Sequence, residues 1–219
     1  MCHLPNYLYQ PPYGVATLAP EALDLLERLY RHDADTLAHS WRVAGLSASL
    51  YARLLDSQAR SLSLQALHHA ALLHDIGKLS IPRELLQAPR ALIPEERCLM
   101  QCHASEGGLL LDTLGEPLRT LSIEIAVGHH ECWDGSGYPG QIMTKALPLH
   151  CRVVGLMDVF DALASPRAYK AGWPLDRLIA LFVAQAGRQF DPQLIGRLSP
   201  LWKELLAVHH QLLDQTRSD

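Results

Sequence analysis

Apolar residues recur at helical intervals along most of the chain, and no segment shows the alternation of apolar and polar residues that a β-strand would give. Leu23, Leu26 and Tyr30 begin the first helical pattern, and residues 37–54 continue it at mostly helical spacing. Further helices are expected at 63–77, from 94 to beyond 103, and at 118–127, 149–164, 174–186, 191 onward and 200–215. The pattern therefore predicts an all-α fold.

Residues that commonly begin helices support these boundaries. Ser63 suits an N-cap position, and Pro94-Glu95-Glu96 places proline and two acids in a first turn. Asp191 and Pro200 mark two later starts in the same way. Residues 132–147 are instead rich in glycine, so we expect a long ordered loop there.

The length of 219 residues suits one domain with its own core. We expect an irregular lead-in at 1–19 and a single domain at 20–219. Hydrophobic residues make up 48% and charged residues 19%, which excludes a disordered chain. No apolar run reaches the roughly 18 residues of a membrane span, and residues 1–6 lack the features of a secretion signal. These observations predict a cytoplasmic protein that does not bind membranes.

The net charge of −4 argues against a long nucleic acid as partner, because neutralising its phosphates needs a basic face. The net charge does not exclude small phosphorylated ligands, since a few local cations suffice to bind them. The five cysteines include no CxxC pair and are expected to be reduced thiols. A zinc site from Cys98, Cys102 and His103 lacks a fourth ligand at the usual spacing.

Twelve histidines stand out because several adjoin an acid or another histidine. The candidate metal ligands come from five places in the chain: His39, His74-Asp75, His103, His129-His130 and Asp158. Neighbouring residues on a helix point about 100° apart, so each adjacent pair suits two neighbouring metals, or one metal where the helix frays. Both pairs fall at predicted helix ends, and Asp75 has two oxygens with which to bridge two cations.

The type of ligand indicates the metal and its chemistry. Imidazole and carboxylate without thiolate favour Fe or Mn, with Zn, Ni or Co as weaker alternatives. Two such cations about 3.5–4 Å apart would activate a bridging hydroxide and neutralise a phosphoryl group under in-line attack.

The other histidines are expected to be ordinary polar residues. They are His3, His32, His68-His69, His150 and His209-His210. We expect His209-His210 on the solvated side of the last helix. Asp161, one turn after Asp158, is expected to stabilise its helix or support a ligand rather than bind metal.

The order His39, His74-Asp75, Asp158 resembles the H…HD…D arrangement of the HD-domain metal-dependent phosphohydrolases. Longer segments resemble the HD-GYP family within them, over about residues 35–195. The matching segments are LHDIGKLSIP at 73–82, HHECWDGSGYP at 129–139, DVFDALASPRAYK at 158–170 and FDP at 190–192. The resemblance implies an HD-domain helical bundle with a long glycine-rich GYP loop and a single HD-GYP-type catalytic domain at 20–219.

The resemblance also implies an enzyme. It would be a bacterial signalling phosphodiesterase that opens cyclic di-GMP to linear pGpG, and sometimes onward to GMP. One metal would be held by His39, His74, Asp75 and Asp158. Asp75 would bridge to a second metal held by His103, His129 and His130.

Other motif positions imply contacts with the substrate. Lys78 matches the lysine near the scissile phosphate, where it would stabilise developing charge. Arg167 and Lys170 match contacts to substrate phosphates, and Tyr138 lies in the motif loop beside the substrate. Asp134 is expected to organise the glycine loop.

The sequence departs from the family pattern at three places. Asp35 stands where some members have a third-metal glutamate, and its shorter side chain leaves a third metal in doubt. Ala168 replaces the proline of the usual RPY. Gln141 and Thr144 replace two glycines that often follow GYP, so the loop over the substrate is expected to differ in shape.

Three alternatives compete with a cyclic di-GMP phosphodiesterase. They are a phosphodiesterase for another cyclic or linear nucleotide, a non-hydrolysing sensor or docking module, and a di-iron oxygenase. The retained ligands and Lys78 favour hydrolysis over sensing, and the GYP loop disfavours the oxygenase. Only 34 residues precede Asp35, too few for a sensor domain. We therefore expect control by expression, metal supply, a regulatory protein partner or a homodimer.

Overall fold

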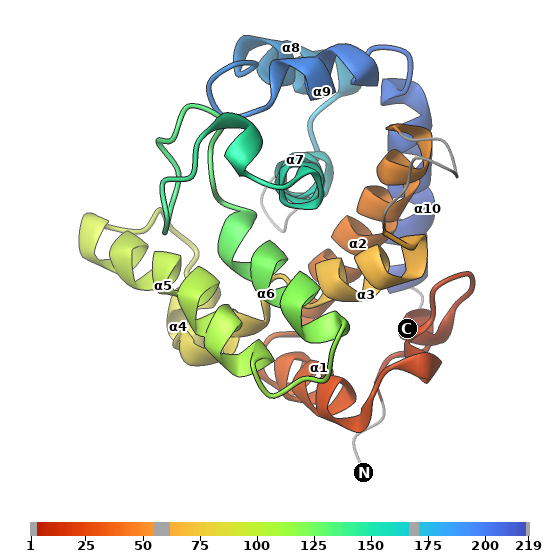
Figure 1. The fold of residues 1–219 in the computed structure, drawn as a ribbon, viewed down its shortest axis with the longest axis vertical. Helices are drawn as coiled ribbons and strands as arrows, with labels where there is room; N and C mark the ends of the chain where they lie inside the picture. Colours follow the sequence, from red (N-terminus) through yellow and green to blue (C-terminus); the bar gives the residue numbers. More distant parts are fainter. Residues whose placement is uncertain (1–3, 55–61, 167–170, 218–219) are drawn as a thin grey trace.

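The computed structural model describes residues 4–54, 62–166 and 171–217, and α-helices dominate this part of the chain (Figure 1). No strand occurs in these ranges, which confirms the all-α prediction, and no helix within them is long and apolar enough to cross a bilayer. The α-helices are α1 (Pro20–His32), α2 (Ala34–Leu54), α3 (Leu64–Leu72), α4 (Arg83–Leu86), α5 (Pro94–Leu111), α6 (Leu118–Gly128), α7 (Leu149–Ala164), α8 (Leu175–Ala184), α9 (Pro192–Leu198) and α10 (Trp202–Arg217). The 3-10 helices are η1 (Asn6–Tyr9), η2 (Val15–Thr17), η3 (Ile76–Ser80) and η4 (Thr144–Ala146).

Helices α2 and α7 form the centre of the bundle. α2 packs against α1, α3, α7 and α10, while α7 also contacts α6 and α8. Figure 1 shows α7 end-on near the middle, with α2, α3 and α10 on one side and α5 and α6 on the other. Phe160 of α7 stacks on Phe182 and Trp202 at centroid distances of 6.2 and 6.4 Å, so aromatic packing joins α7 to α8 and α10.

Capping contacts explain several helix starts. The Ser63 side chain accepts a hydrogen bond from the Ala66 backbone, as predicted for an N-cap, and Asp191 caps α9 in the same way. One predicted boundary is wrong, because α3 ends at Leu72 rather than near Gly77. The backbone turns after Leu72 and continues as η3, which leaves His74 and Asp75 in the turn between two helices.

The lead-in contributes to the core. It contains η1 and η2, and Tyr7, Leu8 and Val15 are buried against the helices. The ring of Tyr7 lies 5.9 Å from that of Trp41 on α2. The division of the chain into a lead-in and one domain stays a prediction.

Gly77 allows η3 to lie directly on α5. A Cβ at Gly77 would overlap the carbonyl oxygen of His103 and the backbone nitrogen of Gly107. Backbone atoms of a packed helix cannot move aside as the tip of a side chain can, so only glycine fits. This close approach fixes Asp75 and Lys78 beside His103.

We expect Gly77→Ala to destabilise the protein by about 3 kcal/mol, because the overlap is with backbone. For a chain of this size that corresponds to a fall in Tm of roughly 6–12 °C. Gly196→Ala on α9 is the matched control, because no atom lies within 4 Å of its added Cβ. Thermal unfolding followed by circular dichroism makes the comparison, and equal Tm values for the two variants would contradict this account.

Candidate metal centre

The seven side chains predicted as metal ligands lie together where five segments meet. His39 comes from α2, His103 from α5 and Asp158 from α7. The turn after α3 supplies His74 and Asp75, and the end of α6 supplies His129 and His130. Three overlapping groups have ligand atoms within 4.8 Å of one another: His39, His74 and Asp158; His74, Asp75 and His129; and His103, His129 and His130.

A second glycine contact sets the position of α7. A Cβ at Gly155 would overlap the carbonyl oxygen of His129, so α7 runs against the backbone at the end of α6. Asp158 lies three residues after Gly155, close to one helical turn, and therefore projects on the same side. The contact brings the carboxylate of α7 to the histidines of α6.

Asp75 lies between the groups, and its two oxygens face different histidines. Oδ1 is 3.4 Å from Nε2 of His103 and 3.9 Å from Nε2 of His129. Oδ2 is 3.4 Å from Nε2 of His74 and 3.9 Å from Nε2 of His39. The carboxylate is thus oriented as a bridge between two sets of nitrogen donors.

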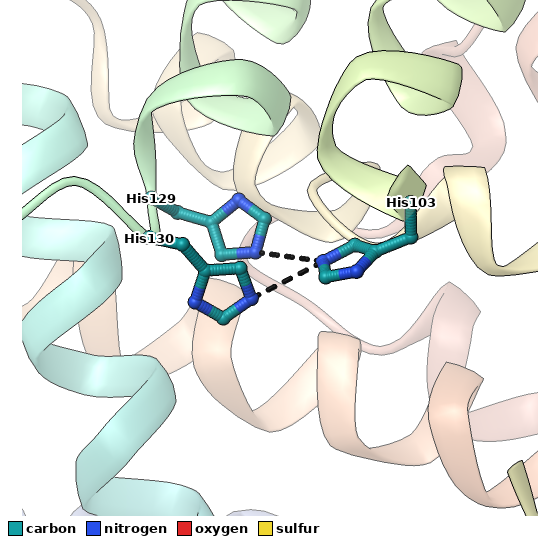
Figure 2. Close-up of side chains that lie close together, drawn as sticks. All are labelled: His103, His129 and His130. Carbon is teal, nitrogen blue, oxygen red and sulfur yellow. Dashed lines mark hydrogen bonds between the residues drawn. The ribbon is translucent and has the colours of Figure 1, made fainter. Parts of the chain in front are cut away.

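We call His103, His129 and His130 the second group. Figure 2 shows their rings converging from α5 and from the end of α6. Nε2 of His103 is 3.4 Å from Nε2 of His129 and 3.2 Å from Nε2 of His130. The three nitrogens surround one point, as ligands of a single cation would.

The opposite side of three rings is held by backbone. Nδ1 of His74, His103 and His129 each donates to a carbonyl three residues earlier, at 2.8, 2.6 and 2.9 Å. A carbonyl only accepts, so the ring proton is on Nδ1 and the Nε2 lone pair faces the centre. Nε2 of His74 is buried without a hydrogen-bond partner. The arrangement fits bound cations, which would satisfy these lone pairs.

The first group consists of His39, His74 and Asp158. Nε2 of His39 is 2.9 Å from Oδ1 of Asp158, and its Nδ1 is 2.7 Å from Oδ2 of Asp161. Asp161 therefore contacts a proposed ligand, which suits the supporting role expected for it. Burial opposes a charge on His39, but the two carboxylates outweigh it and raise its pKa to about 9.

The charge states of the other groups suit metal binding. Burial raises the pKa of Asp75, but the Lys78 ammonium and the neighbouring imidazoles outweigh it and hold the pKa well below its ordinary value. The pKa of Asp158 is likewise lowered, because the contact with His39 outweighs burial. Burial chiefly lowers the pKa of each histidine in the second group, that of His130 to about 4. Ionised carboxylates and neutral imidazoles are the forms that bind metal.

The cluster is accessible from one side. Asp75 is only 2% exposed, whereas the side chains of His39, Lys78 and His130 are 16, 21 and 27% exposed. Tyr138 stacks on His130 with ring centroids 4.8 Å apart. A cavity of about 300 Å³, lined by His130 and Tyr138 among others, adjoins the cluster. The cavity meets the cluster at His129 and His130.

Two acids, buried Glu131 and exposed Asp134, shape the GYP loop through hydrogen bonds with its backbone. Glu131, for which the motif predicted no separate role, is buried and accepts hydrogen bonds from the backbone of Gly140 and Ile142. Asp134 accepts from the backbone and hydroxyl of Ser136, as expected for a loop organiser. Contacts within the loop therefore fix its path beside His130.

The two positions where the family often has glycine adopt left-handed backbone conformations here. Gln141 has φ 53° and Thr144 has φ 51°. This region is unfavourable for a β-branched residue, at a cost of roughly 1–2 kcal/mol.

We expect Thr144→Gly to raise stability by about 1 kcal/mol and Tm by roughly 2–4 °C. Thermal unfolding measures both variants, with Lys145→Gly as the control: residue 145 has no positive φ, so glycine there should lower Tm. A Tm below that of the wild type for Thr144→Gly would show that the backbone at residue 144 is not strained.

Other predicted residues lie elsewhere. Arg167 and Lys170 fall outside the described residues. Asp35 is exposed, and none of the metal-binding groups found in the described part of the chain includes it. Cys98 and Cys102 are also exposed and belong to none of those groups, while His103 joins the second group. The described residues therefore give no support to the alternative zinc site.

The expectation that His209 faces solvent is wrong. His209 is fully buried, and its Nε2 lies 3.1 Å from Oδ1 of Asp161, whereas His210 is exposed. The sequence held the signal, because His209 is four residues after Leu205 and three before Leu212 and so shares their apolar face. Arg42 also contacts Asp161 and was missed, although it lies three residues after His39 on the same helix.

Comparison with known proteins gives a family match. The HD domain family model matches residues 15–194. The 3'3'-cGAMP-specific phosphodiesterase 2 of Vibrio cholerae serotype O1 is 37% identical over 183 residues, which are 82% of this chain and 34% of that protein. The cyclic di-GMP phosphodiesterase of Thermotoga maritima is 34% identical over 199 residues, 90% of this chain and 53% of that protein. The chain thus spans about a third to a half of the length of these curated relatives.

A solved structure supports the same fold. The HD domain of the phosphodiesterase PgpH from L. monocytogenes matches with a TM-score of 0.56, covering 87% of this chain and 97% of that chain. The sequence identity is 17%, so the likeness concerns the helical architecture.

Proposed function

This chain belongs to the HD domain family, in its HD-GYP branch, and from that premise we propose that it is a metal-dependent phosphodiesterase acting on cyclic dinucleotides. The observation that carries the proposal is the orientation of Asp75. One of its oxygens faces His103 and His129, and the other faces His39 and His74. A carboxylate shared between two sets of imidazoles suits a centre of two cations.

The donor set indicates what the centre would hold. The first cation would be bound by His39, His74, Asp75 and Asp158, and the second by Asp75, His103, His129 and His130. Imidazole and carboxylate donors favour Fe or Mn, with Zn, Ni or Co as weaker alternatives. Bound cations would supply activation of water and neutralisation of the phosphoryl charge.

The protein's own side chains would complete the site. Lys78, with Nζ 2.6 Å from Oδ2 of Asp75, would stabilise the negative charge that develops on the phosphoryl oxygens. Tyr138, stacked on His130, would line the approach to the centre. Arg167 and Lys170 stay predicted phosphate contacts.

We propose cyclic di-GMP as the substrate, with 3'3'-cGAMP as the alternative, because curated relatives carry both names. Hydrolysis adds one water to a phosphodiester. The hydroxyl bonds to phosphorus, the bond from phosphorus to the ribose 3'-oxygen breaks, and that oxygen gains the proton. The product of the first step would be linear pGpG. A non-hydrolysing sensor is less favoured, because all seven proposed ligands and Lys78 are present in the cluster.

The proposal is tested by incubating metal-reconstituted protein with cyclic di-GMP, 3'3'-cGAMP and cyclic di-AMP and identifying the products by chromatography. We expect linear dinucleotide from at least one of the first two, and none after metal removal with a chelator. Binding of a cyclic dinucleotide without product would favour the sensor. Neither binding nor product with all three would contradict the proposal.

A further inference from the structure

The carboxylate of Asp161 is fully buried and joins three helices behind the proposed metal centre. Oδ2 is 2.7 Å from Nδ1 of His39 and 2.9 Å from Nη2 of Arg42. Oδ1 is 2.7 Å from Nε of Arg42, 3.1 Å from Nε2 of His209 and 3.2 Å from Oγ of Ser165. Asp161 thus links His39 on α2 to His209 on α10.

The contacts leave this carboxylate little freedom. Arg42 binds both oxygens in a fork, which fixes the plane of the carboxylate and balances its charge. His209 approaches Oδ1 from α10, and its ring lies edge-on to Phe160 with centroids 6.0 Å apart. Nδ1 of His209 is buried without a hydrogen-bond partner, which costs less as a lone pair than as an N–H. The ring proton is therefore assigned to Nε2, where it faces Oδ1 of Asp161 and Oγ of Ser165, each 3.1 Å away.

The direction of His39 depends on this arrangement. A carboxylate at Nδ1 holds the ring so that Nε2 points to Asp158 and Asp75. The carboxylate is in turn held in place by α10, which packs on α2, α7 and α8. Helix α10 begins at Trp202, beyond the residues that the family model matches.

We propose that His209 is a positioning residue for the first metal site: through Asp161 it fixes the imidazole of His39, so the C-terminal helix takes part in binding one of the two cations. The inference rests on the proposed two-metal function. It assigns no such role to α10 at the second group, where carbonyls of α5 and α6 hold the rings of His103 and His129. The two sites should therefore respond differently to changes at residue 209.

The test is titration of metal-free full-length protein with Co²⁺ against a competing chelator, with the absorption spectrum of each bound ion recorded. His209→Phe keeps a ring but removes the hydrogen-bond donor. We expect this variant to bind one of the two ions with about 10–100-fold lower affinity, while its affinity for the other ion is unchanged. His209→Gln restores an N–H donor, and its Co²⁺ affinity should be closer to that of the wild type. His210→Phe is the matched control at the exposed neighbouring position.

The outcomes separate the two proposals. Two ions bound with wild-type affinity and spectra in His209→Phe, even with a lower Tm, would mean that His209 only stabilises the fold. An equal loss of affinity for both ions would also overturn the inference, because His209 would then not act on the first metal site in particular. Fewer than two ions in the wild-type protein would instead overturn the two-metal function, and the inference with it.

Discussion

Replacing Asp75 by Asn is expected to reduce turnover of the cyclic dinucleotide at least about a thousandfold, a barrier increase of about 4 kcal/mol. The amide keeps the shape of the side chain but offers one oxygen only. Its NH₂ group would face either the nitrogens of His103 and His129 or those of His39 and His74. One cation therefore loses the oxygen ligand that residue 75 supplies, whichever way the amide is oriented.

Steady-state kinetics and elemental analysis on reconstituted protein measure this effect. The metal content should fall below two ions per chain while the helical circular dichroism is kept. Asp24→Asn is the control, because the side chain of Asp24 is 68% exposed and pairs with Arg28 one turn along α1. Turnover within about tenfold of wild type for Asp75→Asn, a change of only about 1.4 kcal/mol, would rule out the bridging role.

Replacing Lys78 by Ala is expected to lower kcat by about 10²–10³ while changing substrate affinity much less. Burial opposes the charge of Lys78, but Asp75 and Asp158 outweigh it and raise its pKa, so the ammonium is kept. A cation held beside the centre acts mainly where negative charge develops, in the transition state.

Two measurements separate catalysis from binding here. Steady-state kinetics give kcat, and calorimetry with a non-hydrolysable phosphorothioate analogue gives the affinity. Lys203→Ala on the exposed side of α10 controls for the loss of a positive charge. If Lys78→Ala instead keeps kcat and binds the analogue poorly, the lysine serves ground-state binding.

The helical pattern predicted the fold class and most helices, because the spacing of apolar residues decides which face is buried. It could not predict the end of α3. That boundary depends on the contact between Gly77 and the backbone of His103, far along the chain. Packing of the lead-in also escaped prediction, since Tyr7 and Leu8 are buried only because helices from elsewhere cover them.

The motifs likewise identified the proposed ligands but not their supports. Adjacent pairs such as His74-Asp75 stand out in a sequence, whereas Arg42 and His209 look like ordinary helix residues. Their role appears only when α2, α7 and α10 meet at Asp161. No sequence pattern shows which oxygen of Asp75 faces which histidines, since that follows from the turn after α3.

The central claim is that two cations lie on either side of Asp75. Anomalous diffraction from crystals of Mn²⁺-loaded protein tests it most directly, with data collected at an X-ray wavelength at which manganese gives a strong anomalous signal. We predict two peaks about 3.5–4 Å apart. One should lie beside His39, His74 and Asp158, and the other beside His103, His129 and His130. A single peak, or peaks away from both oxygens of Asp75, would contradict the account.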